Sequence, residues 1–164
     1  MKKLTLIILI CLLLTGCYKM PEVPETDPLP GTSETQAVTI PAGVTITIYQ
    51  GNDNADGFVT KQVQVEEVNM NVLVDELIKA NVLTEDVSIG SMQFDGTCLN
   101  LSFSPSFGEL ICSMGTTGEY IIIGSVVNTF LDAYPGYESV FITIGHSILE
   151  SGHHVYDSPM TRFE

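Results

Sequence analysis

The sequence has little positive charge. Only six Lys and Arg residues stand against 20 Asp and Glu residues in 164, which gives a formal net charge of −14. Because proteins hold a nucleic-acid backbone with clustered Lys and Arg, this composition argues against nucleic acid as a partner. Charged residues make up 16% of the chain and hydrophobic residues 45%, which excludes a wholly disordered protein. The length predicts one folded domain.

The chain also lacks an apolar run long enough for a transmembrane helix. The longest run, residues 4–14, is interrupted only by Thr5 and follows Lys2 and Lys3. As a helix it would span roughly 16 Å, against about 30 Å for the apolar core of a bilayer. A short apolar run behind two positive charges is typical of a signal peptide.

The next residues, Leu14-Thr15-Gly16-Cys17, resemble the lipobox of bacterial lipoproteins. In such proteins the Cys thiol receives a diacylglyceryl group and becomes the new N-terminus after cleavage. The resemblance implies a lipoprotein signal peptide at residues 1–16 and lipidation of Cys17 with fatty-acyl chains such as palmitate. It also implies a location on the outer, extracytoplasmic face of the cell membrane. The alternative is an ordinary secretory signal with a coincidental Cys.

Residues 17–37 join the candidate lipidation site to the rest of the chain. They contain four prolines and several acidic residues, namely Pro21, Pro24, Pro28, Pro30, Glu22, Glu25, Asp27 and Glu34. Prolines disfavour helix and sheet, and the carboxylates repel one another, so we expect an extended tether. Removal of residues 1–16 would leave four basic residues against 20 acidic ones, a net charge of −16. An anionic membrane surface repels such a charge, so the folded part should stand away from the lipid.

The folded domain is expected at residues 38–164, where the hydrophobic pattern becomes periodic. Alternating apolar and polar residues predict strands at residues 44–49, 59–65, 87–94, 99–103 and 140–144. Apolar residues at helical spacing predict helices at residues 70–78, 105–114 and 116–134. The predicted order is β-β-α-β-β-α-α-β, an α/β (α+β) sandwich with the helices packed on a mixed β-sheet. A short hairpin through Ile148 and Leu149 is expected to follow.

Turn and cap residues support these elements. Asn69 or Asn71 is expected to cap the first helix, Gly90 to form a β-bulge, and Asp95-Gly96 to form a hairpin turn.

The other two helices carry start signals as well. Ser104 and Pro105 are expected at the N-cap and N1 positions of the second helix. Thr116 and Glu119 have the spacing of a capping box at the start of the third helix. The buried face of the third helix is expected to consist of Ile123, Val127, Phe130, Leu131 and Tyr134.

Several short motifs together resemble the GerMN domain, the sporulation and spore germination domain of bacterial lipoproteins. They are residues 51–58 after a strand that contains Tyr49, the Asp95-Gly96 turn with Leu99-x-Leu101-Ser102, Phe107-Gly108-Glu109-Leu110, Gly118-Glu119-Tyr120, Val126-Val127-Asn128-Thr129-Phe130, and Val140-x-Ile142-x-Ile144-Gly145. The resemblance covers residues 38–164 and implies an architecture similar to the ring-building modules of secretion and sporulation channels. It implies a non-enzymatic role in the cell envelope. The spore protein carries two such domains and this chain has room for one, so an envelope role in a vegetative cell is the alternative to sporulation.

Residues 52–57 contain a weak candidate calcium site. They place Asn, Asn, Asp and Gly at positions 1, 3, 5 and 6 of a calcium loop, and Asp53 and Asp56 would supply carboxylates. Position 12, where a bidentate Glu normally closes the loop, is Val63. The alternative is a turn between strands, in which Asn, Asp and Gly are favoured.

Cys98 and Cys112 are a candidate disulfide, because an exported domain meets an oxidising environment. The loop between them is about 15 residues, for which a bridge would contribute about 3 kcal/mol. Cys98, however, is expected to face opposite to Leu99 and Leu101, and Cys112 lies off the apolar stripe of its helix. The pairing therefore stays open.

The sequence offers no persuasive catalytic constellation. It has no Gly-x-Ser-x-Gly motif, and its carboxylates are scattered. His146, His153 and His154 lie near Glu150 and Asp157, but glycine-containing turns are expected to place these histidines in solvent rather than around zinc.

We therefore expect a non-enzymatic envelope protein without a cofactor. It would act through protein–protein contacts or cell-wall binding, with membrane attachment at Cys17 and self-association as expected contacts. The alternative is a cell-wall hydrolase or its accessory domain.

Overall fold

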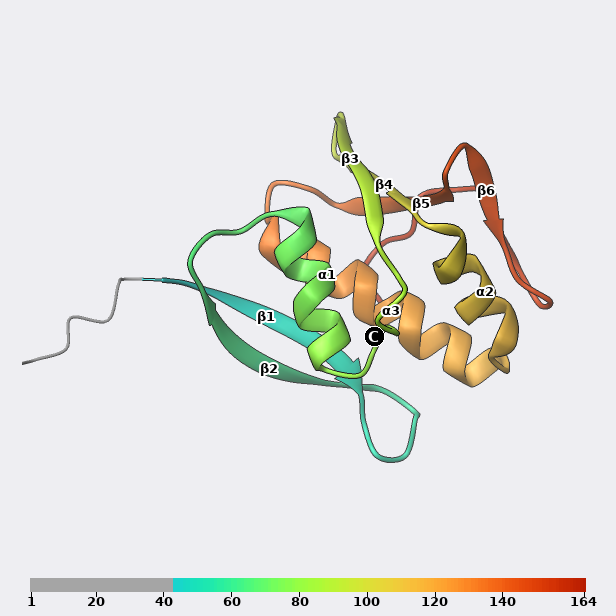
Figure 1. Ribbon diagram of the computed structural model, residues 1–164, viewed down its shortest axis with the longest axis horizontal. Coiled ribbons are helices and arrows are strands. Elements are labelled where there is room, and N and C mark those ends of the chain that lie inside the picture. Colours follow the sequence, from blue (N-terminus) through green and yellow to red (C-terminus); the bar gives the residue numbers. More distant parts are fainter. Residues whose placement is uncertain (1–42) are drawn as a thin grey trace, which may run out of the picture. The chain divides into compact units, whose positions relative to one another are not determined.

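The computed structural model describes residues 43–164, which form seven strands and three helices (Figure 1). The elements are β1 (Val44–Gly51), β2 (Phe58–Val65), α1 (Met70–Lys79), β3 (Ile89–Asp95), β4 (Cys98–Phe103), α2 (Pro105–Ser113), α3 (Thr116–Ala133), β5 (Ser139–Ile144), β6 (Ser147–Glu150) and β7 (Val155–Tyr156). The predicted order from β1 to β5 is confirmed, and so is the α+β fold class. The hairpin strand at Ile148 and Leu149 is β6, whereas the two-residue strand β7 was not predicted.

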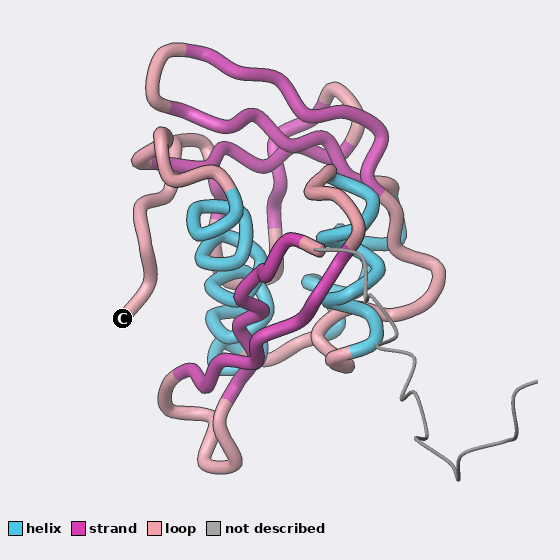
Figure 2. The backbone as a smooth tube through the Cα atoms, turned by 90° about the vertical axis from the view of Figure 1, so that its left-hand side faces the viewer, coloured by secondary structure: helices cyan, strands magenta, loops and turns pink. Residues whose placement is uncertain are grey.

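The strands form two sheets and not the single mixed sheet that the sequence predicted. Among residues 43–164, strands β1 and β2 pair only with each other, antiparallel, from Val44 opposite Val65 to Gly51 opposite Phe58. The other sheet has the order β3-β4-β5-β6-β7. Figure 2 shows the β1–β2 hairpin apart from the larger sheet, and α1 and α3 contact strands of both sheets.

The larger sheet is mixed because of the connection between β4 and β5. These two strands are parallel, with Leu99 opposite Val140 and Leu101 opposite Ile142, whereas the other pairs are antiparallel. Parallel neighbours need a crossover connection, and α2 and α3 supply it. Helix α2 packs on the sheet through Phe107, whose ring stacks on that of Phe103 at 4.5 Å between centroids.

Helix α3 is the centre of the core. It contacts β1, β5, α1 and α2. The predicted buried residues Ile123, Val127, Phe130 and Leu131 are at most 4% exposed, which confirms that face, whereas Tyr134 is half-buried at the C-cap. However, every residue from 122 to 131 is buried. A one-sided apolar stripe was too narrow a prediction, because this helix has neighbours on more than one side.

Most of the predicted turns and caps are present. Asn69 caps α1, with its Oδ1 accepting a hydrogen bond from the Val72 amide at 3.0 Å. The register of β3 shifts between Ile89 and Ser91, as a bulge at Gly90 predicts. The predicted Asp95-Gly96 turn is shifted by one residue. Asp95 is the last residue of β3 and pairs with Cys98, so the turn consists of Gly96, with a left-handed φ of +56°, and Thr97.

The second helix is capped differently from the expectation. Ser104 occupies the N-cap and Pro105 follows it, but the Ser104 hydroxyl forms no hydrogen bond with its own helix. Its Oγ accepts instead from the Ser88 amide at 3.1 Å, and this contact ties the loop before β3 to the start of α2.

The predicted capping box at the start of α3 is wrong. The N-cap is Gly115, and the structure shows no side-chain cap. Glu119 is 2% exposed, and its Oε1 accepts hydrogen bonds from Ser151 and Tyr156 rather than from the cap backbone. The carboxylate that the local spacing assigned to the helix cap is therefore bound by the β6–β7 turn and by β7.

Candidate functional site

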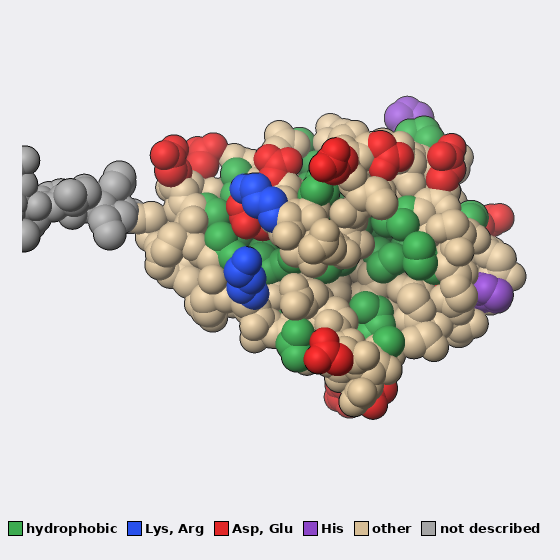
Figure 3. Space-filling model, turned by 60° about the horizontal axis from the view of Figure 1, so that its bottom comes forward, with side chains coloured by type: hydrophobic (Ala, Val, Ile, Leu, Met, Phe, Trp, Pro, Cys, Tyr) green, Lys and Arg blue, Asp and Glu red, His purple; other side chains and the backbone are tan. Residues whose placement is uncertain are grey.

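The described surface contains a groove of about 630 Å³. It lies between the end of β1, the loop after α1, the end of α2 and the first turns of α3. Figure 3 shows apolar side chains in a hollow of this face and acidic side chains along its upper border. We call it the α1–α2 groove.

The loop after α1 builds one wall of the α1–α2 groove. Asn81 has a left-handed φ of +57°, which turns the chain back on the helix. The amides of Val82 and Leu83 then donate to the Leu77 carbonyl at 2.9 and 3.3 Å. This backbone return buries Val82 and Leu83 and presents them together in the wall.

The floor of the groove is apolar and its rim is acidic. Half-buried Ile78, Leu110, Met114 and Ile121 line it, and Glu85 stands at its rim. Beside Glu85, a hydrogen bond from the Thr84 side chain is the main cause that holds the pKa of the Asp86 carboxyl below its usual range. Among the described residues that line the groove there is no Lys or Arg. Chemically, the groove suits an apolar segment that carries positive charge beside it.

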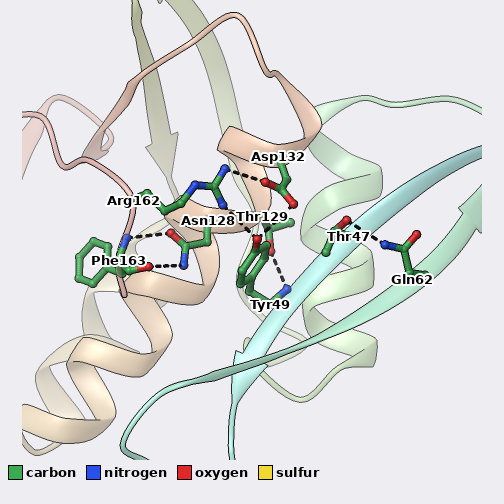
Figure 4. Close-up of polar contacts among 8 residues, drawn as sticks. All are labelled: Thr47, Tyr49, Gln62, Asn128, Thr129, Asp132, Arg162 and Phe163. Carbon is green, nitrogen blue, oxygen red and sulfur yellow. Dashed lines mark hydrogen bonds and ion pairs between the residues drawn. The ribbon is translucent and has the colours of Figure 1, made fainter.

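A polar network apart from the lining of the groove fixes β1 and the C-terminal segment to α3 (Figure 4). The Asp132 carboxylate accepts from Tyr49 Oη at 3.2 Å and pairs with Arg162 at 2.6 Å. Arg162 also donates to Tyr49 Oη at 3.0 Å. Burial is the largest cause that raises the pKa of the Tyr49 phenol, and the Asp132 charge raises it further. The network is therefore a structural clamp with its phenol kept neutral.

Of the predicted site residues, Cys17 lies outside the described part. The carboxylates of Asp53 and Asp56 lie in the β1–β2 loop, which closes on its own hydrogen bonds. Asp56 Oδ1 accepts from the Asn52 side-chain amide at 2.8 Å, while Asn52 Oδ1 accepts from the Asp56 amide at 3.2 Å. Ala55 has a φ of +55°. The geometry is that of a turn between strands, the alternative named above.

The two cysteines do not form the candidate disulfide. Both are free thiols: Cys98 Sγ lies 3.8 Å from Asn100 Oδ1, and Cys112 Sγ lies 3.4 Å from the Glu150 carbonyl oxygen. Cys98 faces away from buried Leu99 and so lies on the sheet face opposite to α2, which carries Cys112. The sheet itself therefore separates them.

The three histidines are exposed. His146 lies at the β5–β6 turn, and His153 and His154 lie in the β6–β7 turn. Within residues 43–164, no group of three or more His, Cys, Asp or Glu residues is arranged to hold a metal ion.

Sequence reasoning missed both the α1–α2 groove and the burial of Glu119. The groove residues look like ordinary core positions, and the groove arises only from the way the loop after α1 folds. The partners of Glu119, Ser151 and Tyr156, are 32 and 37 residues away along the chain, so no local signal could have joined them.

The fold itself is found in a solved structure. The tandem GerMN domains of the sporulation protein GerM from Bacillus subtilis match with a TM-score of 0.53 and 20% sequence identity, over 79% of this chain. The chain has a GerMN-like fold. It spans about half the length of that structure, 50%, in line with one domain of a tandem pair.

Other comparisons are weaker. A Clostridium perfringens protein described as a candidate lipoprotein matches the GerMN-like chain with a TM-score of 0.45 and 16% identity, over 73% of this chain and 88% of that one. No protein-family model matches the sequence, and neither does any curated protein. Among residues 43–164, no helix has both the length and the apolar character that a membrane crossing requires.

Proposed function

We propose that this chain is a lipid-anchored protein on the outer face of the cell membrane that acts by binding other envelope components. The biological setting we infer is sporulation, germination or peptidoglycan remodelling. The anchor is supported by Leu14-Thr15-Gly16-Cys17, and the setting by the GerMN-like fold shared with the sporulation protein GerM. The binding role is carried by one observation, the half-buried apolar floor of the α1–α2 groove.

The partner of the groove is an envelope protein with an apolar segment flanked by Lys or Arg. Charge complementarity supports this partner, because the described part contains three basic residues against 16 acidic ones and the groove rim carries Glu85. The same charge opposes self-association, so a second copy should bind only where salt or calcium screens the carboxylates. Attachment to a membrane raises the effective concentration, so weak contacts suffice.

The anchor is tested by replacement of its thiol. The Cys17→Ala chain, expressed in a bacterial host that processes lipoproteins, should stay uncleaved or leave the membrane fraction, because no thioether can form at Ala. Cys112→Ala is the matched control, since this exposed thiol lies in the folded part. Normal processing and tight membrane binding of the Cys17→Ala chain would contradict lipidation.

The groove is tested by a charge placed on its floor. The Leu110→Lys lipoprotein should lose partners that the parent chain retains after crosslinking and purification from solubilised membranes. Ile148→Lys adds the same charge at a side chain that is 46% exposed and outside the groove, so it should keep them. Equal retention by both variants would remove the groove from the proposal. Sedimentation of the mature chain with and without about 150 mM salt or calcium separately tests self-association.

A further inference from the structure

A second cavity, of about 340 Å³, opens where the start of α3 meets the C-terminal segment. Glu119, Tyr120, Tyr156, Met160 and Phe163 line it. The volume is at the lower end of the range for sites that hold small molecules. We call it the Glu119 cavity, and it shares no residue with the α1–α2 groove.

Only one of the two oxygens of the Glu119 carboxylate has hydrogen-bond partners among the described residues. Its Oε1 accepts hydrogen bonds from Ser151 Oγ and from Tyr156 Oη, each at 2.6 Å. Its Oε2 is buried and has no hydrogen-bond partner among the described residues. Buried polar atoms are almost always paired, so an unpartnered oxygen beside a cavity indicates a donor that comes from outside the chain. The position in the first turn of α3 favours a negatively charged side chain there.

The walls around this carboxylate are aromatic. The rings of Tyr120 and Phe163 meet edge to face at 5.2 Å between centroids, and those of His154 and Tyr156 do so at 4.6 Å. Met160 adds a flexible apolar side chain. Aromatic faces attract cations and also pack against apolar groups.

We propose that the Glu119 cavity binds a primary ammonium group carried on a small apolar or aromatic body. An ammonium offers three hydrogen-bond donors and no acceptor, which matches a carboxylate oxygen that lacks a donor. The aromatic walls receive the body of the ligand, and the carboxylate fixes its charged end. This site goes beyond the proposed function, which rests on Cys17 and on the α1–α2 groove.

The test uses 2-phenylethylammonium as the probe and the methionine methyl groups as reporters. In the full-length chain, purified in detergent and labelled at those methyl groups, the probe should shift the Met160 resonance through the ring current of its phenyl group. Met114, in the α1–α2 groove, should not move. The neutral analogue 2-phenylethanol should bind about ten-fold more weakly or worse, because a hydrogen bond to a charged group is lost.

Two variants make the result specific. Glu119→Gln keeps an acceptor for Ser151 and Tyr156 but removes the charge, so the affinity for the ammonium probe should fall about ten-fold or more. Glu109→Gln, at an exposed carboxylate on α2, controls for the general attraction of cations to an acidic chain and should change nothing. If Glu119→Gln does not fold, Ser158→Trp at the exposed rim should fill the cavity and abolish the Met160 shift.

Three outcomes would overturn the site. They are equal shifts with the alcohol and the ammonium, an unchanged affinity in the folded Glu119→Gln or Ser158→Trp chain, and an equal loss in the Glu109→Gln control. None of these outcomes would contradict the proposed lipid anchor or the proposed binding role of the α1–α2 groove.

Discussion

The ring of Phe58, at the start of β2, lies directly against the Cα atom of Gly124 in the middle of α3. A Cβ atom at Gly124 would lie 2.4 Å from Phe58 Cζ and 3.0 Å from two ring atoms of Phe163. Glycine in a helix interior costs about 1 kcal/mol relative to alanine. Here the missing side chain lets the β1–β2 hairpin and the C-terminal segment meet on the same helix.

Gly124→Ala should therefore destabilise the protein although it favours the helix. Overpacking costs roughly 1–3 kcal/mol, which exceeds the gain of about 1 kcal/mol in helix propensity. The urea midpoint should fall. Gly118→Ala is the matched control in the same helix, because its Cβ would meet the flexible Met114 side chain at 3.3 Å or more. Its midpoint should stay the same or rise, and a rise for Gly124→Ala as well would refute the close approach.

The hydrophobic periodicity of the sequence was enough to predict the strands and helices from β1 to β6. Alternating apolar residues indicate a strand and apolar residues at helical spacing indicate a helix, and both patterns are local in the sequence. It could not predict the full burial of α3. Asn128 and Thr129 look like solvent positions in the sequence, yet each has a specific distant partner. The Tyr49 amide donates to Thr129 Oγ1 at 3.0 Å, and Asn128 pairs with the backbone of Phe163.

Phe130→Ala should cost about 3–5 kcal/mol of stability, through lost transfer free energy and a residual cavity. Phe130 is fully buried in the core around α3. Phe94, whose ring is 55% exposed beside Tyr134 and Tyr137, is the matched control, and Phe94→Ala should cost much less. Urea denaturation of both variants decides the point. Equal midpoints for parent and Phe130→Ala would place that ring at the surface.

Asn128→Ala should loosen the C-terminal segment. The Asn128 amide group donates to the Phe163 carbonyl at 3.0 Å, and its Oδ1 accepts from the Phe163 amide at 2.9 Å. Loss of both bonds should cost about 1–3 kcal/mol and speed hydrogen exchange at the Phe163 amide. Asn71→Ala, at an exposed position of α1, should leave that exchange unchanged. Unchanged exchange in Asn128→Ala would mean that other contacts hold the segment.

The Glu119 cavity shows where sequence reasoning ends. A Glu three residues into a helix has the same local pattern whether it caps the helix or lies buried against distant strands. Ser151 in the β6–β7 turn and Tyr156 in β7 decide between the two, and β7 has only two residues and no periodic signal.

Deprotonation of the Tyr156 phenol should lower the free energy of unfolding at alkaline pH. Burial is the main cause that raises the pKa of its phenol above the ordinary 10.0, and its hydrogen bond to Glu119 adds to the rise. The unfolded chain thus releases this proton at lower pH than the folded chain does. The contribution is fully present below about pH 10 and is lost as pH rises through the folded-state pKa.

The measurement is the urea midpoint at about pH 9 and about pH 11. The parent chain should lose stability between the two, and Tyr156→Phe should lose less because its ring has no proton to release. Some decline should remain in the variant, since burial also raises the pKa values of Tyr49 and Tyr134. Glu119→Gln should flatten the decline in part, because it removes the negative charge beside the phenol but leaves the ring buried. A decline as steep in Tyr156→Phe as in the parent would show that this phenol is not linked to folding.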